Sequence, residues 1–143
     1  YGNIIGPRSR HGVVWDFFHK LRGDASQLVI LGDGQQEKSY LHVSDAVSAT
    51  LLAWEKTEGF GAFNAASDRT LKVTELAGVV CDELGVNPQF RFTGGERGWK
   101  GDVRVARVDV RKLQSWGWRP GYTPEEAVRD QVRWMVDAFG FGD

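Results

Sequence analysis

Apolar and polar positions recur along this chain at two different periods, and these periods predict its helices and strands. Apolar residues three or four positions apart predict amphipathic helices over 12–23, 46–58, 73–84 and 124–139. Short apolar runs predict strands over 1–5, 28–31, 40–43, 60–65 and 90–92. A shorter helix over 108–116 completes the elements that this pattern indicates.

Capping signals locate some of these helices more closely. Thr123 at the cap, Pro124 at the first helical position and Glu126 three residues after the cap predict the start of the last helix. We expect Ser44-Asp45 to cap the helix that begins near Ala46. Four apolar residues form a packing stripe on the last helix: Val128, Val132, Met135 and Phe139. Residues 140–143 are expected to be a frayed tail.

The stretch 28–45 carries the first indication of chemistry. The strand 28–31 is followed by Gly32-Asp33-Gly34, a turn sequence in which glycine reaches dihedrals that other residues resist. A loop with one cation, Lys38, then leads to the strand 40–43 and to a capped helix. A strand, a glycine-rich loop, a cation and a helix start together predict a cradle for an anion.

Composition narrows the class of protein. The 143 residues suit one compact domain, 1–143, and 41% hydrophobic with 26% charged residues predicts a globular fold. Eighteen cations against nineteen anions leave a net charge of −1, which argues against nucleic acid as a partner. The single cysteine, Cys81, excludes an internal disulfide and a cysteine-based metal cluster, and the three histidines lack metal-ligand spacing. No apolar run suits a membrane span or signal peptide, so a cytoplasmic location is expected.

Four motifs in order resemble those of the extended short-chain dehydrogenase/reductases, the NAD-dependent nucleotide-sugar epimerase/dehydratase family. The stretch 32–45 resembles the family's GDGxQxR-D-F/Y-x-x-V-x-D segment. Residues 1–8, YGNIIGPR, resemble its R-x-x-N-V-Y-G-P-R strand, and 61–67 resemble its F-N-I-G-S strand. Gly101-Asp102, DVRKL at 109–113 and GWRP at 117–120 resemble its closing run. The likeness covers nearly the whole chain.

The resemblance implies roles for residues that would hold the diphosphate and ribose of a nucleotide sugar. Lys38 stands where the family has a diphosphate-binding arginine, so the charge is kept and the bidentate geometry is lost. Asn3 matches an asparagine that reaches the diphosphate, and Gly12 and Val13 open the helix that lies beside it. Asp102 matches the aspartate that accepts hydrogen bonds from the ribose hydroxyls.

The resemblance also implies contacts at the uracil end of the expected ligand and near the nicotinamide. Backbone groups of Val29 and Ile30 match the strand that recognises uracil, and Tyr1 matches an aromatic residue near the nicotinamide. Trp99 takes the place of a second diphosphate-binding arginine. Arg97 or Lys100 could supply the charge that this replacement removes, and Trp99 could stack on a base or sugar ring.

Two features that the family's chemistry needs are missing from the sequence. No strand is followed by a complete glycine-rich dinucleotide fingerprint. The tyrosines at 1, 40 and 122 are followed four residues later by Ile5, Ser44 and Glu126, so none forms the Tyr-x-x-x-Lys acid/base pair. We therefore expect no catalytic residue in this chain and no tight binding of NAD, which the resemblance implies only for the complete enzyme.

The resemblance implies a mixed α/β fold, the C-terminal substrate lobe of such an enzyme with a last Rossmann strand or two and without the N-terminal nucleotide-binding core. The start at Tyr1, without methionine, suggests a fragment. The expected partners are a UDP-sugar, the missing N-terminal half and a second copy in a homodimer. Two alternatives stay open: a stand-alone noncatalytic module that binds a nucleotide sugar or a protein, and half of a split enzyme. Neither the sugar nor the reaction follows from these motifs.

Overall fold

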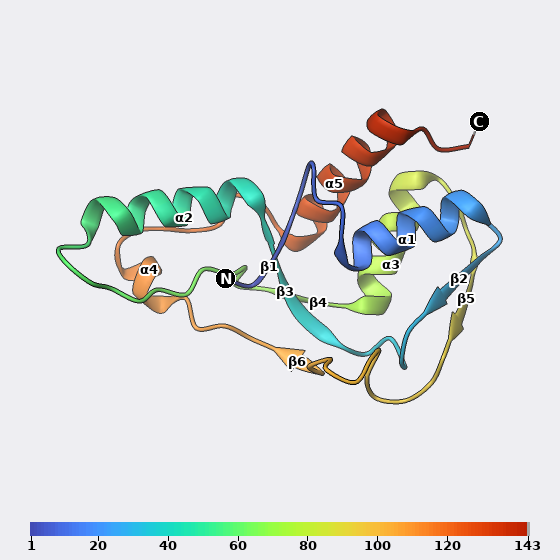
Figure 1. The fold of residues 1–143 in the computed structure, drawn as a ribbon, viewed down its shortest axis with the longest axis horizontal. Coiled ribbons are helices and arrows are strands. Elements are labelled where there is room, and N and C mark those ends of the chain that lie inside the picture. Colours follow the sequence, from blue (N-terminus) through green and yellow to red (C-terminus); the bar gives the residue numbers. More distant parts are fainter. Residues whose placement is uncertain (143) are drawn as a thin grey trace.

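The larger of two sheets runs through the middle of the molecule (Figure 1), in a computed structural model that describes residues 1–142. Its central strand, β3 (Glu37–His42), pairs in parallel with β1 (Asn3–Ile5) and with β6 (Val105–Ala106). β3 also pairs with β4 (Thr70–Lys72), and this pairing is antiparallel. Parallel and antiparallel pairs thus occur in one sheet, and the expected mixed α/β class is confirmed.

The larger hydrophobic core lies at one end of this sheet, around a second, two-stranded sheet. β2 (Gln27–Ile30) and β5 (Gln89–Phe92) pair in parallel and pack with α1 (Gly12–Gly23), α3 (Val73–Leu84) and α5 (Pro124–Phe139) (Figure 1). The largest of the fully buried side chains come from each of these helices and from β2: Phe17, Phe18, Leu21, Leu28, Ile30, Leu76 and Met135.

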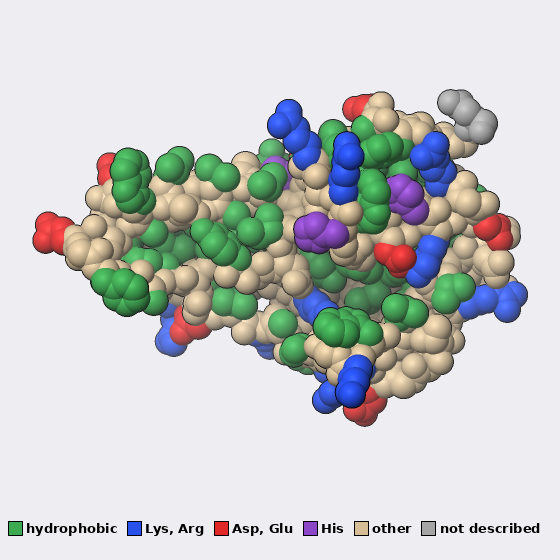
Figure 2. All heavy atoms as spheres, in the orientation of Figure 1, with side chains coloured by type: hydrophobic (Ala, Val, Ile, Leu, Met, Phe, Trp, Pro, Cys, Tyr) green, Lys and Arg blue, Asp and Glu red, His purple; other side chains and the backbone are tan. Residues whose placement is uncertain are grey.

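The other end of the molecule carries α2 (Val43–Lys56) and α4 (Arg111–Ser115) around a smaller core. α2 buries small side chains there, Ala46 and Ala49, and turns its large apolar residues outward. Figure 2 shows hydrophobic side chains gathered on the surface over this helix. The most exposed of them is Trp54, at 80%.

The predicted ends of the helices α3 and α5 are confirmed in atomic detail. Thr123 Oγ1 accepts from the N–H of Glu126 at 3.2 Å, and Glu126 Oε2 accepts from the N–H of Thr123 at 2.7 Å. Gly85 ends α3 with a left-handed φ of 68°. Asp143, in the expected frayed tail, lies outside the described residues. None of the helices within 1–142 combines the length and apolar character that crossing a membrane requires.

Cys81, the single cysteine, is buried in the larger core. Its burial, with a smaller contribution from Asp82, raises the pKa of the thiol to about 11. A thiol with so high a pKa is almost entirely protonated near neutral pH and is a poor nucleophile.

Several predicted boundaries are wrong. Residues 60–65 form no strand: Phe60 is 96% exposed, and the backbone link to the sheet is a 2.8 Å hydrogen bond from the N–H of Gly2 to the carbonyl of Ala65. β3 begins at Glu37 instead of at 40, so Lys38 lies on a strand and not in a loop. β4 and β6 were not expected, and α4 is shorter than 108–116. With three and two residues these strands are too short to show an apolar alternation, and both are strands because they pair with β3.

The predicted cap of α2 is also wrong. Its N-cap is His42, whose Nδ1 accepts from the N–H of Ser44 at 3.2 Å. Asp45 instead reaches across to the segment before α5, where it accepts from the N–H groups of Gly121 at 2.9 Å and Tyr122 at 3.1 Å. Asp45 therefore joins the two ends of the molecule, a role that its neighbours in sequence could not reveal.

Candidate functional site

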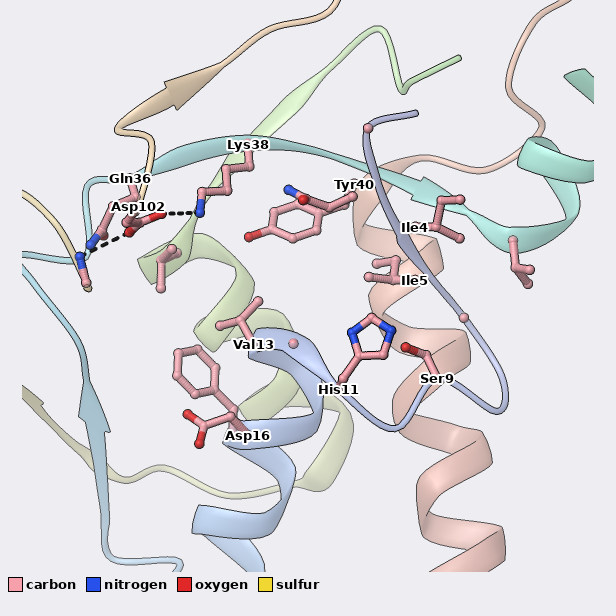
Figure 3. Close-up of a pocket in the computed structure, with 18 of the residues that line it drawn as sticks. Ile4, Ile5, Ser9, His11, Val13, Asp16, Gln36, Lys38, Tyr40 and Asp102 are labelled. Atoms are coloured by element: carbon pink, nitrogen blue, oxygen red, sulfur yellow. Dashed lines mark hydrogen bonds and ion pairs between the residues drawn. The ribbon is translucent and has the colours of Figure 1, made fainter. Parts of the chain in front are cut away.

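A cavity of about 880 Å³ opens between β1, β3, the first turn of α1 and the loop 94–102 (Figure 3). Its volume lies within the range of small-molecule sites, roughly 300–1,000 Å³. The residues of its wall with polar side chains are Asn3, Arg8, Ser9, His11, Asp16, Gln36, Lys38, Tyr40, Trp99 and Asp102, and Gly12, Val13 and Gly98 add backbone groups.

The alternation of side chains along β3 builds one wall of this cavity. Successive residues of a strand point to opposite faces, so positions 36, 38 and 40 share the cavity face. Ser39 and Leu41 point the other way: Ser39 Oγ donates to the carbonyl of Ser67 at 3.2 Å, and Leu41 lies in the smaller core. Because 36–39 was predicted as loop, the sequence singled out Lys38 and missed its neighbours on the same face, Gln36 and Tyr40.

Lys38 and Asp102, 64 positions apart in sequence, form an ion pair inside the cavity (Figure 3). The Lys38 ammonium donates to Asp102 Oδ1, and the other oxygen, Oδ2, accepts from the N–H of Gly98 at 3.0 Å. The side chain of Lys38 is 23% exposed and that of Asp102 is 6% exposed. The cation expected at the diphosphate and the carboxylate expected at the ribose therefore lie next to each other and are paired with each other.

The surroundings of Asp102 keep its carboxyl ionised. Burial acts to raise the pKa of Asp102, but hydrogen bonds from Lys38 and from the N–H of Gly98 outweigh burial and hold the pKa below its usual value. The site therefore presents a carboxylate, which accepts hydrogen bonds and donates none.

Gln36 closes the cavity beneath the loop 94–102. It is 1% exposed, and its Nε2 donates to the carbonyl of Leu31 at 3.2 Å. Among the described residues its Oε1 has no hydrogen-bond partner. Gly32 leaves room for this amide: a Cβ on Gly32 would lie 2.3 Å from Gln36 Nε2, and its φ of 77° favours glycine.

The first turn of α1 faces the cavity with its backbone. The N-cap residue, His11, makes no side-chain cap hydrogen bond, and Gly12 and Val13 line the cavity. No atom lies within 4 Å of where a Cβ on Gly12 would stand. Open N–H groups at a helix N-terminus favour an anion. The structure thus places a helix start and a cation, Lys38, around one space.

The residues predicted from the sequence divide into two groups. Six of them line the cavity: Asn3, Gly12, Val13, Lys38, Trp99 and Asp102. The others lie outside its wall: Tyr1, Val29, Ile30, Arg97 and Lys100. Among this second group, Ile30 is fully buried in the larger core, and the carbonyl of Val29 accepts from Lys20 Nζ at 3.1 Å. Arg97 and Lys100 are exposed on the loop, and the roles predicted for these residues stay predictions.

Sequence reasoning also missed Arg8, a cation on the cavity wall. Arg8 is the one non-glycine residue within 1–142 with a positive φ, 71°. Backbone strain of this kind costs about 1–3 kcal/mol and is found often at functional sites. The Gly-Pro pair before Arg8 was the signal available in the sequence, because it marks a tight turn directly after a strand.

The described residues do not fit NAD. A dinucleotide site needs a glycine-rich turn from a strand into a helix start that holds the pyrophosphate. The turn from β1 into α1 lacks that fingerprint, and its helix start faces the cavity just described. Tyr1, the one residue assigned to the cofactor, is 66% exposed and hydrogen-bonds through its hydroxyl to Thr50 Oγ1 at 2.5 Å.

Known proteins similar to this chain are found both by sequence and by structure. Residues 1–66 match the model of the NAD dependent epimerase/dehydratase family. A Methanocaldococcus jannaschii protein assigned as a UDP-glucose 4-epimerase is 27% identical over 141 residues, which cover 94% of this chain and 44% of that protein. This chain therefore spans less than half the length of that relative.

Two crystal structures extend the likeness to the fold. A UDP-galactose 4-epimerase superimposes with a TM-score of 0.84 and 38% identity, over 97% of this chain and 44% of that one. The Thermotoga maritima UDP-glucose 4-epimerase, solved with UDP-glucose, superimposes with a TM-score of 0.83 and 29% identity. This match covers 96% of this chain and 45% of that one. These findings confirm the resemblance seen in the motifs: the chain is a relative of the NAD-dependent epimerase/dehydratases and corresponds to their C-terminal part.

Proposed function

We propose that this chain is the nucleotide-sugar-binding portion of an NAD-dependent epimerase/dehydratase and that a UDP-sugar occupies the cavity between β3 and α1. The observation that carries the proposal is the meeting of Lys38 and Asp102 in one cavity, beside an open helix start. A cation and free N–H groups suit a diphosphate, and a carboxylate suits a pair of ribose hydroxyls. The related Thermotoga maritima enzyme, which was solved with UDP-glucose, supports this ligand class.

Binding then requires Lys38 and Asp102 to change partners. The ammonium of Lys38 leaves Asp102 Oδ1 for a phosphate oxygen, and Asp102 accepts hydrogen bonds from ribose hydroxyls in its place. Neither charge is left unpaired inside the cavity, which would be costly for groups so little exposed. An anion without a ribose pulls Lys38 away and leaves Asp102 uncompensated. The pair thereby favours nucleotides over simple phosphates.

The chemical step belongs, in this proposal, to an N-terminal half outside this chain. That half would supply the acid/base residues and an NAD site, and the bound cofactor would provide hydride chemistry at a sugar carbon. The exposed apolar face of α2 is the surface that we assign to it. β1 contacts α2 and is an edge strand of the larger sheet, which could continue into further strands.

Replacing Lys38 tests the proposal. Isothermal titration of the chain with UDP-glucose should give a dissociation constant of about 10 μM to 1 mM, because half of the cleft wall is absent. Lys38→Met should weaken binding roughly 10- to 100-fold, since a hydrogen bond to a charged group is lost. Lys38→Arg, which restores the family's residue, should bind at least as well as the wild type.

Lys112→Met is the matched control, because Lys112 is exposed and its Nζ donates to the carbonyl of Ala62, away from the cavity. It should leave the affinity unchanged. The proposal fails if the wild-type chain gives no heat with millimolar UDP-glucose, or if Lys38→Met and Lys112→Met bind the ligand equally well.

A further inference from the structure

Three side chains outside the cavity wall are joined in one line by hydrogen bonds: Ser44, His42 and Asp130. Ser44 Oγ lies 2.6 Å from His42 Nδ1, and Asp130 Oδ2 lies 3.0 Å from His42 Nε2. His42 ends β3, Ser44 lies in the first turn of α2 and Asp130 lies on α5. A hydroxyl, an imidazole and a carboxylate in this order are the groups from which an activated serine is built.

The backbone of Ser44 determines which nitrogen of His42 carries the hydrogen. The N–H of Ser44 donates to His42 Nδ1 at 3.2 Å, so Nδ1 holds the lone pair of the neutral ring. The ring hydrogen is then on Nε2, which donates it to Asp130. Nδ1 therefore also accepts from the hydroxyl of Ser44, and this is the tautomer that a general base needs.

The fold holds the imidazole ring of His42 in this position. The side chain of His42 is 5% exposed, and Tyr122 stacks on its ring with centroids 3.9 Å apart. The backbone of Gly6 also packs closely, because a Cβ on Gly6 would lie 3.2 Å from His42 Nε2. A ring packed in this way keeps its hydrogen bonds aligned, so little ordering is needed when a reaction begins.

Ser44, in contrast to His42, is exposed to solvent. Its hydroxyl is therefore within reach of a molecule in solution. Ser44 belongs to the first turn of α2, where backbone N–H groups have no carbonyl partner within the helix. The N–H of the next residue, Asp45, can donate to negative charge that develops on a carbonyl oxygen.

We propose that Ser44 is a nucleophile that accepts an acyl group from an ester, with His42 as its general base and Asp130 as the residue that positions the ring. The hydroxyl of Ser44 gives its proton to His42 Nδ1 while Oγ forms a bond to the carbonyl carbon. The C–O bond of the ester then breaks, and the departing alcohol takes the proton from His42. The product is an acyl-serine at position 44, and no group of the nucleotide-sugar site takes part.

Reaction with p-nitrophenyl acetate tests the inference, because acyl transfer releases coloured nitrophenol. The wild-type chain should release about one equivalent in a rapid phase, and peptide mass spectrometry should find the acetyl group on Ser44. Ser44→Ala should lose this phase. Asp130→Asn should acylate at least about tenfold more slowly, because an amide does not stabilise the imidazolium ion that forms. Asp130→Glu, which keeps a carboxylate, should recover part of this loss.

Ser115→Ala is the matched control, because Ser115 is also exposed but its Oγ donates to the carbonyl of Lys112 at 2.8 Å instead of to an imidazole. It should acylate like the wild type. Acetyl groups on lysines alone, or in equal amounts on Ser44 and Ser115 of the wild type, would overturn the inference. Equal rates for the wild type and Asp130→Asn would also overturn it, because Asp130 would then have no part in positioning His42.

Discussion

Asp102→Asn is expected to weaken the binding of UDP about tenfold or more and to strengthen the binding of pyrophosphate. The first effect follows because a charged acceptor for the ribose hydroxyls is lost, at a cost of about 1.5–3 kcal/mol. The second follows because Lys38 no longer has a carboxylate that competes with the incoming anion. Titration calorimetry with the two ligands measures both effects in one preparation.

Asp109→Asn provides the control for this change of charge. Asp109 is exposed, pairs with Arg111 and lies outside the cavity wall, so its replacement should alter neither affinity. A parallel loss of UDP and pyrophosphate binding in Asp102→Asn would contradict the exchange of partners. It would mean that Asp102 supports the shape of the site and does not hold Lys38 back from anions.

The same carboxylate links stability to pH. The pKa of Asp102 is lower in the folded chain than its ordinary value, so its contribution to stability is present above that value, about 3.9, and is lost as pH falls through the folded pKa. The difference in the free energy of unfolding between the wild type and Asp102→Asn should therefore shrink as the pH falls below about 4.

Gly32→Ala is expected to destabilise the fold by about 2–5 kcal/mol. The left-handed φ of 77° costs a non-glycine residue roughly 1–2 kcal/mol. The added Cβ would also lie 2.3 Å from Gln36 Nε2 and 3.0 Å from the carbonyl carbon of Arg97, which adds roughly 1–3 kcal/mol of overpacking. Urea denaturation followed by circular dichroism measures the total.

Gly59→Ala separates these two causes. Gly59 has a similar φ of 75°, but no atom lies within 4 Å of where its Cβ would stand. Its replacement should cost only the backbone share, about 1–2 kcal/mol. Equal losses at positions 32 and 59 would show that the contact of Gly32 with Gln36 and the loop 94–102 is not tight in solution.

Local signals in the sequence were enough to locate the elements of the larger core. The capping box at Thr123 and the end of the helix predicted over 73–84 depend on residues within one helical turn, and both are found where the sequence predicts them. Strands that depend on distant pairing were missed. β4 and β6 have three and two residues, too few to show a hydrophobic period, and they exist because both pair with the first half of β3.

Residues of the site were predicted where a family motif contains a charged side chain. They were missed where only the position of a residue on a strand brings its side chain into the cavity. Lys38 and Asp102 were each assigned from family motifs, but their pairing joins segments that only the fold brings together. Tyr40 was considered only as a possible half of an acid/base pair, which it is not. The two-residue period of β3 would have shown that Tyr40 shares a face with Lys38, had β3 been predicted to begin at Glu37.

The most direct test of the central claim is an NMR titration of the isotopically labelled chain with UDP, in which backbone amide shifts are followed residue by residue. We predict saturable shifts of amides around the cavity, at Gly12, Val13, Lys38 and Gly98. A second, polar cavity of about 510 Å³ lies on the other face of β3 and includes Ser67, Arg69 and Arg107. Shifts confined to that second cavity, or no shifts at millimolar UDP, would contradict the account.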